Sequence, residues 1–220
     1  MPPDLRGKFI VFDGGEGCGK STQARMLRDR LEAEHVPVQL VHDPGYTDIG
    51  EKIRGILLNP EHTNMAMRCE MLLYMSARAQ MMAEVVMPAL AEGWVVLSDR
   101  FVSSTLAYQV GGDGLTAEEI RRTADIAIKG RWPDLTLIFD LPAEVSMARV
   151  RPKFSLFPDD PTAGLDLDRI EKRPMEYHRQ VLENYRAQAQ SDPDRYRIIR
   201  ADRSIDEVHA DVWANVTALR

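Results

Sequence analysis

The chain has 220 residues, of which 44% are hydrophobic and 28% are charged, proportions that are ordinary for a globular protein with a buried core. Its formal net charge of −6 argues against a nucleic-acid-binding protein, because such proteins normally carry a basic face. It has 2 cysteines, and no stretch approaches the ~18 apolar residues that cross a membrane. We therefore expect a cytoplasmic protein with no disulfide framework and with neither a membrane nor nucleic acid as a partner.

Short apolar runs mark the predicted strands. The first run, KFIVFD, stops at a glycine, which is typical of a buried strand that leads into a turn. Four similar runs follow it at intervals long enough to hold helices. In chain order, the predicted strands are 8–13, 36–42, 93–99, 134–141 and 196–201.

Helical patterns separate these strands. Residues 21–35 repeat apolar side chains at helical spacing, and a long helical region is predicted from about 68 to 91, with an interruption at Pro88. A last helix is predicted beyond the fifth strand. Alternating strands and helices imply parallel pairing through right-handed crossovers. We therefore predict one α/β domain over residues 1–220, with a doubly wound five-stranded parallel sheet flanked by helices.

Two segments differ from this pattern. Residues 43–50, DPGYTDIG, are predicted to form a second active-site loop. Residues 151–168 are rich in proline and acidic side chains and lack helical periodicity, while helix and strand patterns resume after them. We interpret this second segment as a short mobile lid that spans about 149–168, and not as a linker between domains.

Residues 14–21, GGEGCGKS, match the phosphate-binding pattern G-x-x-x-x-G-K-[ST] in full. Glycines let backbone N–H groups converge on phosphate oxygens, and the following helix directs its positive end at the same anion. Lys20 is expected to reach the β- and γ-phosphates of a nucleotide, and the Ser21 hydroxyl to contribute to a Mg²⁺ site. The residues predicted to bind the phosphates of ATP are Gly14, Gly15, Glu16, Gly17, Cys18, Gly19, Lys20, Ser21 and Thr22.

A phosphate loop alone does not distinguish a kinase from an ATPase or a GTP-dependent switch. A switch protein should carry D-x-x-G after its third strand and [NT]-K-x-D after a later one. Here the third strand ends in SDRF, and no [NT]-K-x-D occurs, which disfavours a GTPase. Cys18, within the loop, is interpreted as a small filler residue and not as a redox site.

The segment DRFVSSTLAYQ, residues 99–109, begins at the carboxyl end of the third strand, where open α/β sheets bind their ligands. Asp99 is predicted to hold Mg²⁺ or its waters, and Arg100 is predicted to bind a phosphate. Ser104 and Tyr108 are four residues apart, so they share one face of the predicted helix. The alternative is an ordinary strand-to-helix junction with a capping aspartate and a surface arginine.

Six segments together resemble those of the bacterial thymidylate kinases, which are P-loop nucleoside monophosphate kinases, in both order and spacing. They are FDGGEGCGKSTQ, DPGYT, LLYMSARAQ, DRFVSSTLAYQ, PDLTLIFDLP and DRIE, and the resemblance extends from about residue 7 to 215. It implies transfer of the γ-phosphoryl group of ATP to dTMP, giving dTDP and ADP in the synthesis of dTTP. It also implies Mg²⁺ as a cofactor and, usually, a homodimer.

The resemblance further implies an acceptor site for dTMP. Tyr74 matches the aromatic residue that stacks on thymine, and Arg78, one helical turn on, matches the arginine that hydrogen-bonds the base. For Tyr74, packing in the core among neighbouring apolar residues is the alternative. The implied dTMP-binding residues are Asp43, Pro44, Tyr74, Arg78, Arg100, Ser104, Tyr108 and Gln109.

In the same pattern, Arg100 holds the phosphate of dTMP, while Ser104 and Gln109 contact the base. Tyr108 lies against the sugar, where a 2′-hydroxyl would crowd it. Glu16 matches the loop acid near the acceptor phosphate and Mg²⁺. In the second loop this chain differs from the usual R-E-P-G-G-T, because His42 and Tyr46 stand where arginine and a glycine are common.

The phosphate loop contributes no arginine, although phosphoryl transfer spreads negative charge over three oxygens that an arginine usually stabilises. We expect the missing charge to come from the lid, from Arg149 or Arg151, with Arg151 favoured. Two solvated arginines at a helix end are the alternative. With these two, the expected catalytic residues are Lys20, Glu16, Arg100, Arg149 and Arg151.

Two other functions are considered. One is a kinase that accepts deoxyuridylate or a nucleoside. The other is a regulatory protein that binds nucleotides without turnover. Such a protein should have lost Lys20, Asp99 or the lid arginines, and none of these is missing.

Overall fold

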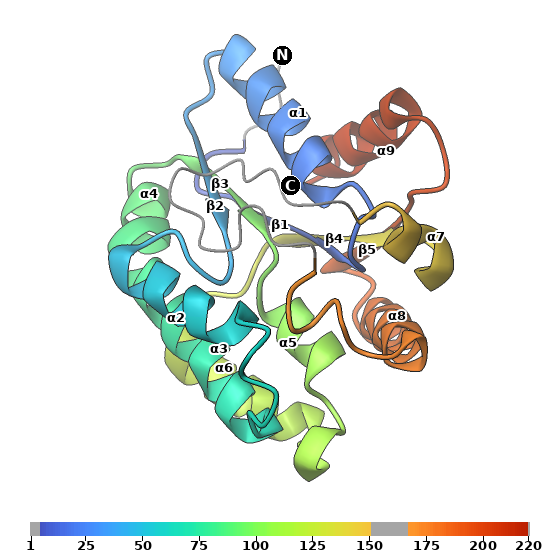
Figure 1. Ribbon diagram of the computed structural model, residues 1–220. Helices are drawn as coiled ribbons and strands as arrows, with labels where there is room; N and C mark the ends of the chain where they lie inside the picture. Colours follow the sequence, from blue (N-terminus) through green and yellow to red (C-terminus); the bar gives the residue numbers. More distant parts are fainter. Residues whose placement is uncertain (1–4, 151–166, 220) are drawn as a thin grey trace.

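A computed structural model describes residues 5–150 and 167–219. Its sheet has five parallel strands in the order β2-β3-β1-β4-β5, as Figure 1 shows. This arrangement confirms the predicted fold class. The strands are β1 (Phe9–Gly14), β2 (Val38–His42), β3 (Val95–Asp99), β4 (Leu135–Asp140) and β5 (Tyr196–Arg200).

Helices cover both faces of the sheet. Figure 1 shows α1 and α9 on one face, and α2, α3, α5, α6 and α8 on the other. The helices are α1 (Lys20–Ala33), α2 (Asp48–Leu58), α3 (Met67–Met81), α4 (Met87–Ala91), α5 (Val102–Tyr108), α6 (Ala117–Ile128), α7 (Ala143–Ala148), α8 (Met175–Ser191) and α9 (Ile205–Thr217). In the described residues, no helix is long and apolar enough to span a bilayer.

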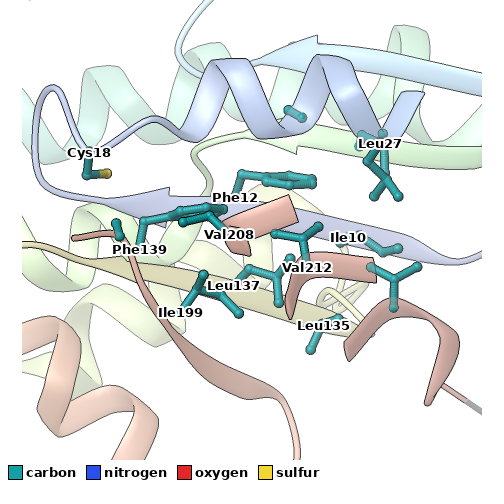
Figure 2. Close-up of a cluster of buried hydrophobic side chains, with 14 of the residues drawn as sticks. Ile10, Phe12, Cys18, Leu27, Leu135, Leu137, Phe139, Ile199, Val208 and Val212 are labelled. Atoms are coloured by element: carbon teal, nitrogen blue, oxygen red, sulfur yellow. The ribbon is translucent and has the colours of Figure 1, made fainter. Parts of the chain in front are cut away.

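The core follows from the two-residue period of the central strand. Ile10 and Phe12 of β1 pack with α1 and α9, and Figure 2 shows them beside Val208 and Val212. The alternate residues of β1, Phe9 and Val11, belong to a second apolar cluster with α3 and α6. A strand that is buried on both faces reads as a continuous apolar run, which is why the strand could be predicted.

The region between β2 and β3 differs from the prediction in two ways. Helix α2, which the sequence analysis did not predict, begins at Asp48 inside the predicted loop 43–50, because the Thr47 side chain caps it by accepting from the Gly50 N–H. The long helical region also departs from α geometry before Pro88 and not at it. Residues Met82–Val86 form a π-turn, in which the Met87 N–H donates to the Met82 carbonyl, and Pro88 then lies in the first turn of α4.

All of the strands point the same way, so their carboxyl ends share one edge of the sheet. β1 and β3 are neighbours, and Phe12 lies beside Asp99 in the register. This edge therefore brings together the phosphate loop after β1, the segment after β3 and the loop after β2. The predicted lid at 149–168 lies mostly outside the described residues, which resume at 167.

Candidate active site

The phosphate loop joins β1 to α1, and two of its glycines are required by close backbone contacts. Gly14 has φ +140°, and a Cβ there would lie 2.5 Å from the Phe139 carbonyl oxygen. Gly17 has φ +65°, and a Cβ there would lie 2.4 Å from the Ser146 carbonyl oxygen. A residue with a side chain would be strained and would clash at either position. The loop therefore has the tight, open-backbone form that phosphate binding needs.

Lys20 is the first residue of α1 and lies against the phosphate loop. It is 6% exposed, and its Nζ donates to the Gly15 carbonyl at 2.6 Å, so the ammonium group lies within the loop. Cys18 is buried beside it with its Sγ 3.6 Å from Nζ. Burial raises the pKa of the Cys18 thiol, and the positive charges of Lys20 and Arg100 offset this only in part. A thiol that stays protonated fits the interpretation of Cys18 as a filler residue.

Ser21 and Asp99 come together at the start of α1. The Ser21 hydroxyl donates to Oδ2 of Asp99, which ends β3. In residues 5–150 and 167–219, no three His, Cys, Asp or Glu side chains gather into a protein-only metal cage. A hydroxyl and one carboxylate nevertheless suit Mg²⁺, which usually takes its remaining ligands from water and phosphate. The residues present thus fit the expected Mg²⁺ site.

Arg100 is the centre of what we call the phosphate end of the cleft, formed by Asp13, Glu16, Arg100, Ser104, Tyr108 and Tyr185. Its backbone has φ +71°, and its NH2 group donates to Oε1 of Glu16 at 2.5 Å. NH1 donates to the Gly14 carbonyl and to Ser104, each at 3.1 Å. Burial acts to lower the pKa of Arg100, but nearby negative charge, first that of Glu16, raises it well above its usual value. Arg100 thus remains a cation.

Asp13 lies beneath Arg100 and was not predicted. Its carboxylate is fully buried and accepts from the hydroxyl groups of Ser103 at 2.5 Å, Ser104 at 2.7 Å and Tyr185 at 2.5 Å. Burial, reinforced by the charge of Asp13, raises the pKa of Tyr185 well above its usual value. The Tyr185 hydroxyl therefore stays protonated and donates a hydrogen bond to Asp13. The apolar run that predicted the first strand ends in FDG. This ending could have indicated a buried acid at the end of the strand.

A cleft with about 520 Å³ of empty space opens beside this network. Every predicted acceptor residue lines it, as do residues that were not predicted. The lining residues are Glu16, Asp43, Pro44, Arg54, Leu58, Tyr74, Arg78, Arg100, Ser104, Thr105, Tyr108, Gln109, Asp168 and Ile170.

Asp43, Tyr74, Arg78 and Gln109 line the far part of this cleft, and Glu70, Arg169 and Arg173 form a charged cluster in contact with Gln109. We call these seven residues together the base end. Arg78 is buried, and its Nε donates to Oδ2 of Asp43 at 2.5 Å, both side chains being 1% exposed. Tyr74 is half-buried one turn earlier on α3, where it packs against an apolar cluster and also lines the cleft. Tyr74 thus packs in the core and also lines the cleft, and its stacking on a base stays a prediction.

The loop between β2 and α2 carries the two residues that differ from the family's usual pattern. His42 Nε2 lies 2.7 Å from Oε1 of Glu51, and the Tyr46 N–H donates to the same oxygen at 2.6 Å. The Tyr46 hydroxyl accepts from Gln39 at 2.7 Å, which holds its side chain although the residue has φ +68°. Arg54, on α2, donates to the Pro44 carbonyl at 3.0 Å. Its helix was not predicted, so neither was its place in the cleft.

Of the two lid arginines, only Arg149 lies within the described residues. A Cβ added at Gly17 would lie 3.2 Å from the Cβ of Arg149. The NH1 group of Arg149 donates to the Ala201 carbonyl at 3.5 Å. The stem of Arg149 thus packs against the phosphate loop while its guanidinium points to the loop after β5. Arg151, the favoured residue, lies outside the described residues.

Comparisons with known proteins extend along nearly the whole chain. A family model described as thymidylate kinase matches residues 12–212. The chain is 43% identical to the thymidylate kinase of Pelotomaculum thermopropionicum over 94% of this chain and 92% of that protein. It is 40% identical to the thymidylate kinase of Ectopseudomonas mendocina over 98% of this chain and 97% of that protein. A crystal structure of thymidylate kinase from Ehrlichia chaffeensis superposes with a TM-score of 0.73 at 25% identity, covering 95% and 97% of the two chains.

Proposed function

The chain belongs to the thymidylate kinase family, whose members are phosphotransferases, and from that premise we propose that it transfers the γ-phosphoryl group of ATP to dTMP. The products are dTDP and ADP, and the reaction serves dTTP synthesis in the cytoplasm. The observation that carries the proposal is one cleft that begins at Glu16 and Arg100 beside the phosphate loop and ends at Tyr74 and Arg78. The cleft can hold an acceptor nucleotide with its phosphate toward the donor.

The donor side binds the phosphates of ATP. Backbone N–H groups of residues 14–22 and the amino end of α1 face the phosphate oxygens. Lys20 leaves its contact with the Gly15 carbonyl and places its charge on the β- and γ-phosphates. Ser21 and Asp99 would hold Mg²⁺, which supplies positive charge to the phosphates when it is bound.

The acceptor side binds dTMP along the cleft. Arg100 receives the phosphate of dTMP, one oxygen of which attacks the γ-phosphorus of ATP in line as ADP leaves. Glu16 belongs to the donor loop, and its ion pair with Arg100 links this arginine to the loop. Tyr108 donates to Glu16 at 3.0 Å and lies against the sugar.

At the other end of the cleft, the thymine ring stacks on Tyr74, and Arg78, Ser104 and Gln109 contact it. Asp43 and Pro44 close the pocket. Arg149 or Arg151 adds positive charge to the transferred group.

A homodimer belongs to the same proposal. Two exposed apolar side chains, Leu72 on α3 and Ile126 on α6, are 52% and 81% exposed. They lie on helices that pack together, and a partner subunit would cover such a surface. Sedimentation equilibrium tests this, with Ile126→Glu expected to shift the protein toward monomer.

The proposed reaction is tested by measuring ADP release with ATP, Mg²⁺ and one acceptor at a time. The acceptors are dTMP, dUMP, dCMP and thymidine. We expect turnover with dTMP to exceed that with any other by at least about 100-fold in kcat/KM. Faster turnover with dUMP or thymidine would favour the rival kinase. ATP binding without turnover of any acceptor would favour a regulatory nucleotide-binding protein.

A further inference from the structure

Glu70 is a buried acid whose place at the base end has no role in the reaction described so far. It lies in the first turn of α3, four residues before Tyr74, and is fully buried. One carboxylate oxygen, Oε1, accepts from Nε2 of Gln109 at 2.7 Å. The other, Oε2, lies 2.5 Å from NH2 of Arg169 and 2.6 Å from NH2 of Arg173. Two guanidinium charges thus surround one oxygen, and an amide meets the other.

This arrangement fixes which way the Gln109 amide points. A carboxylate accepts hydrogen bonds and cannot donate them, so only the NH2 group of the amide can face Oε1. Turning the amide around would place its carbonyl oxygen against the carboxylate oxygen. The pairs with Arg169 and Arg173 hold the carboxylate in place, so it cannot turn away from Gln109.

The carbonyl oxygen of Gln109 is left over by this arrangement. Gln109 is 1% exposed and lines the cleft, and its Oε1 has no hydrogen-bond partner among the described residues. Leaving a buried acceptor without a hydrogen-bond partner is unfavourable. A ligand that brings an N–H group to this oxygen removes that cost, whereas a ligand that brings a second acceptor does not.

From this geometry we propose that Glu70 is a positioning residue that makes the cleft select pyrimidines with a protonated N3. Thymine and uracil carry a hydrogen on N3 and can donate it to Oε1 of Gln109. Cytosine has a lone pair at N3 and would place an acceptor against an acceptor. The proposal rests on the proposed function in one respect, which is that the acceptor substrate is a pyrimidine nucleotide. It assigns the discrimination between dTMP and dCMP to a residue that touches neither.

The test is the selectivity ratio, defined as kcat/KM for dTMP divided by kcat/KM for dCMP. In Glu70→Gln the carbonyl oxygen of the new amide can accept from the arginines, while its NH2 group faces Gln109. That NH2 group can donate to the carbonyl oxygen of Gln109, so the Gln109 amide is no longer held with its NH2 group toward residue 70. We expect the ratio to fall at least about tenfold, chiefly through better use of dCMP. A merely structural role would lower kcat/KM for both nucleotides alike and leave the ratio unchanged. Glu118→Gln, the same change at an exposed ion pair on α6, serves as the matched control.

A double-mutant cycle identifies the partner. Gln109→Met removes the amide, and we expect it to lower the ratio as well. Once Gln109 is methionine, adding Glu70→Gln should change the ratio by less than about twofold, because both residues act through the same oxygen. If the double variant instead lowers the selectivity ratio by the product of the two single-variant effects, the residues have separate roles and the proposal is overturned.

If Glu70→Gln does not fold, a charge-free replacement tests the same point. Glu70→Leu combined with Arg169→Met and Arg173→Met removes the buried charges together, which proteins tolerate better than an unpaired charge. The Gln109 amide then loses its hydrogen bond to residue 70, and we expect the selectivity ratio to fall as in Glu70→Gln. Unchanged selectivity in a folded variant overturns the proposal alone. A wild-type protein that phosphorylates neither nucleotide overturns the proposed function and this proposal with it.

Discussion

The two ends of the cleft balance their buried charges in opposite ways. At the phosphate end, two carboxylates, Asp13 and Glu16, share one guanidinium, that of Arg100. At the base end, the carboxylate of Glu70 lies between two guanidinium groups, those of Arg169 and Arg173. The first arrangement is short of positive charge and the second has an excess.

This difference indicates how each end responds to a ligand. In the proposed function, an incoming phosphate must compete with Glu16 for Arg100, and further cations are needed before negative charge can accumulate there. The base end would receive an uncharged ring, and its ionic groups are already paired with one another. We therefore expect binding to rearrange the phosphate end and to leave the base end nearly as it is.

Removing Lys20 should have the largest effect, because Lys20 lies in the loop beside the phosphate end, which is short of positive charge. We expect Lys20→Ala to lower phosphoryl transfer by about 10³-fold, the upper range for loss of one preorganised electrostatic contact. Steady-state kinetics with ATP and dTMP measure this, and thermal unfolding shows that the variant is folded. Lys52→Ala, at an exposed lysine on α2, is the control. A folded Lys20→Ala protein with more than a tenth of wild-type activity would exclude the assigned role.

The lid arginines should have the next largest effect. If one of them supplies the missing charge during transfer, Arg149→Ala or Arg151→Ala should lower single-turnover transfer at least ~100-fold. ATP and dTMP affinities should hardly change, because the contact forms mainly at the transition state. Equal transfer rates in both variants and wild type would mean that the phosphate end obtains its charge elsewhere.

Tyr74 tests the base end. We expect Tyr74→Ala to weaken dTMP binding by ~1–3 kcal/mol, the usual contribution of base–aromatic stacking, which corresponds to about 5- to 150-fold in affinity. Tyr74→Phe should retain the affinity, since it keeps the ring. Calorimetric titration with dTMP beside thermal unfolding measures both effects. A large loss of stability with unchanged affinity in the folded fraction would support core packing as the only role of the ring.

Glu16 tests the competition at Arg100. We expect Glu16→Gln to lower the KM for dTMP about fivefold, which is roughly the contribution of one partly buried charge pair. Turnover should fall at the same time, because Glu16 also organises the acceptor phosphate. Kinetics over a range of dTMP concentrations separate the two parameters. A rise in KM would show that Glu16 helps the phosphate to bind and does not oppose it.

The smallest effect concerns the loop that carries Asp43 to the base end. Burial alone would raise the pKa of Glu51, but hydrogen bonds from His42 and the Tyr46 N–H outweigh burial and lower it. A lowered pKa in the folded protein stabilises it above the unfolded pKa of Glu51, near 4.5, and the stabilisation is lost as the pH falls further. Glu51→Gln should therefore lower Tm by about 2–4 °C at pH 7.

This difference between Glu51→Gln and wild type should shrink as the pH falls below about 4.5, the usual pKa of glutamate. Thermal unfolding from pH 3.5 to 7.5 measures it. The same difference in Tm at every pH would show that the effect is packing and not charge.

The parts of the site that lie close together in the sequence were predictable. The phosphate loop is one continuous segment, and its glycines indicate where the backbone takes a positive φ or makes a close contact. Tyr74 and Arg78 are one helical turn apart. By contrast, Asp13, Glu70 and Arg169 act through partners far away in the chain, so no local pattern indicates which contacts they make. Glu70 could have been considered, since it lies one turn before Tyr74. Arg54 was missed because α2 begins at a threonine cap inside a segment with loop-like composition.

The contact between Asp13 and Tyr185 has a consequence for how the chain folds during its synthesis. These residues are 172 positions apart, so a growing chain exposes its complete phosphate loop long before α8 exists. Domains generally fold as units, and until Tyr185 arrives the acid at the end of β1 lacks one of its donors. A chain released early should carry a nucleotide-binding loop without a finished acceptor pocket. Synthesis of nearly the whole polypeptide therefore precedes assembly of the site.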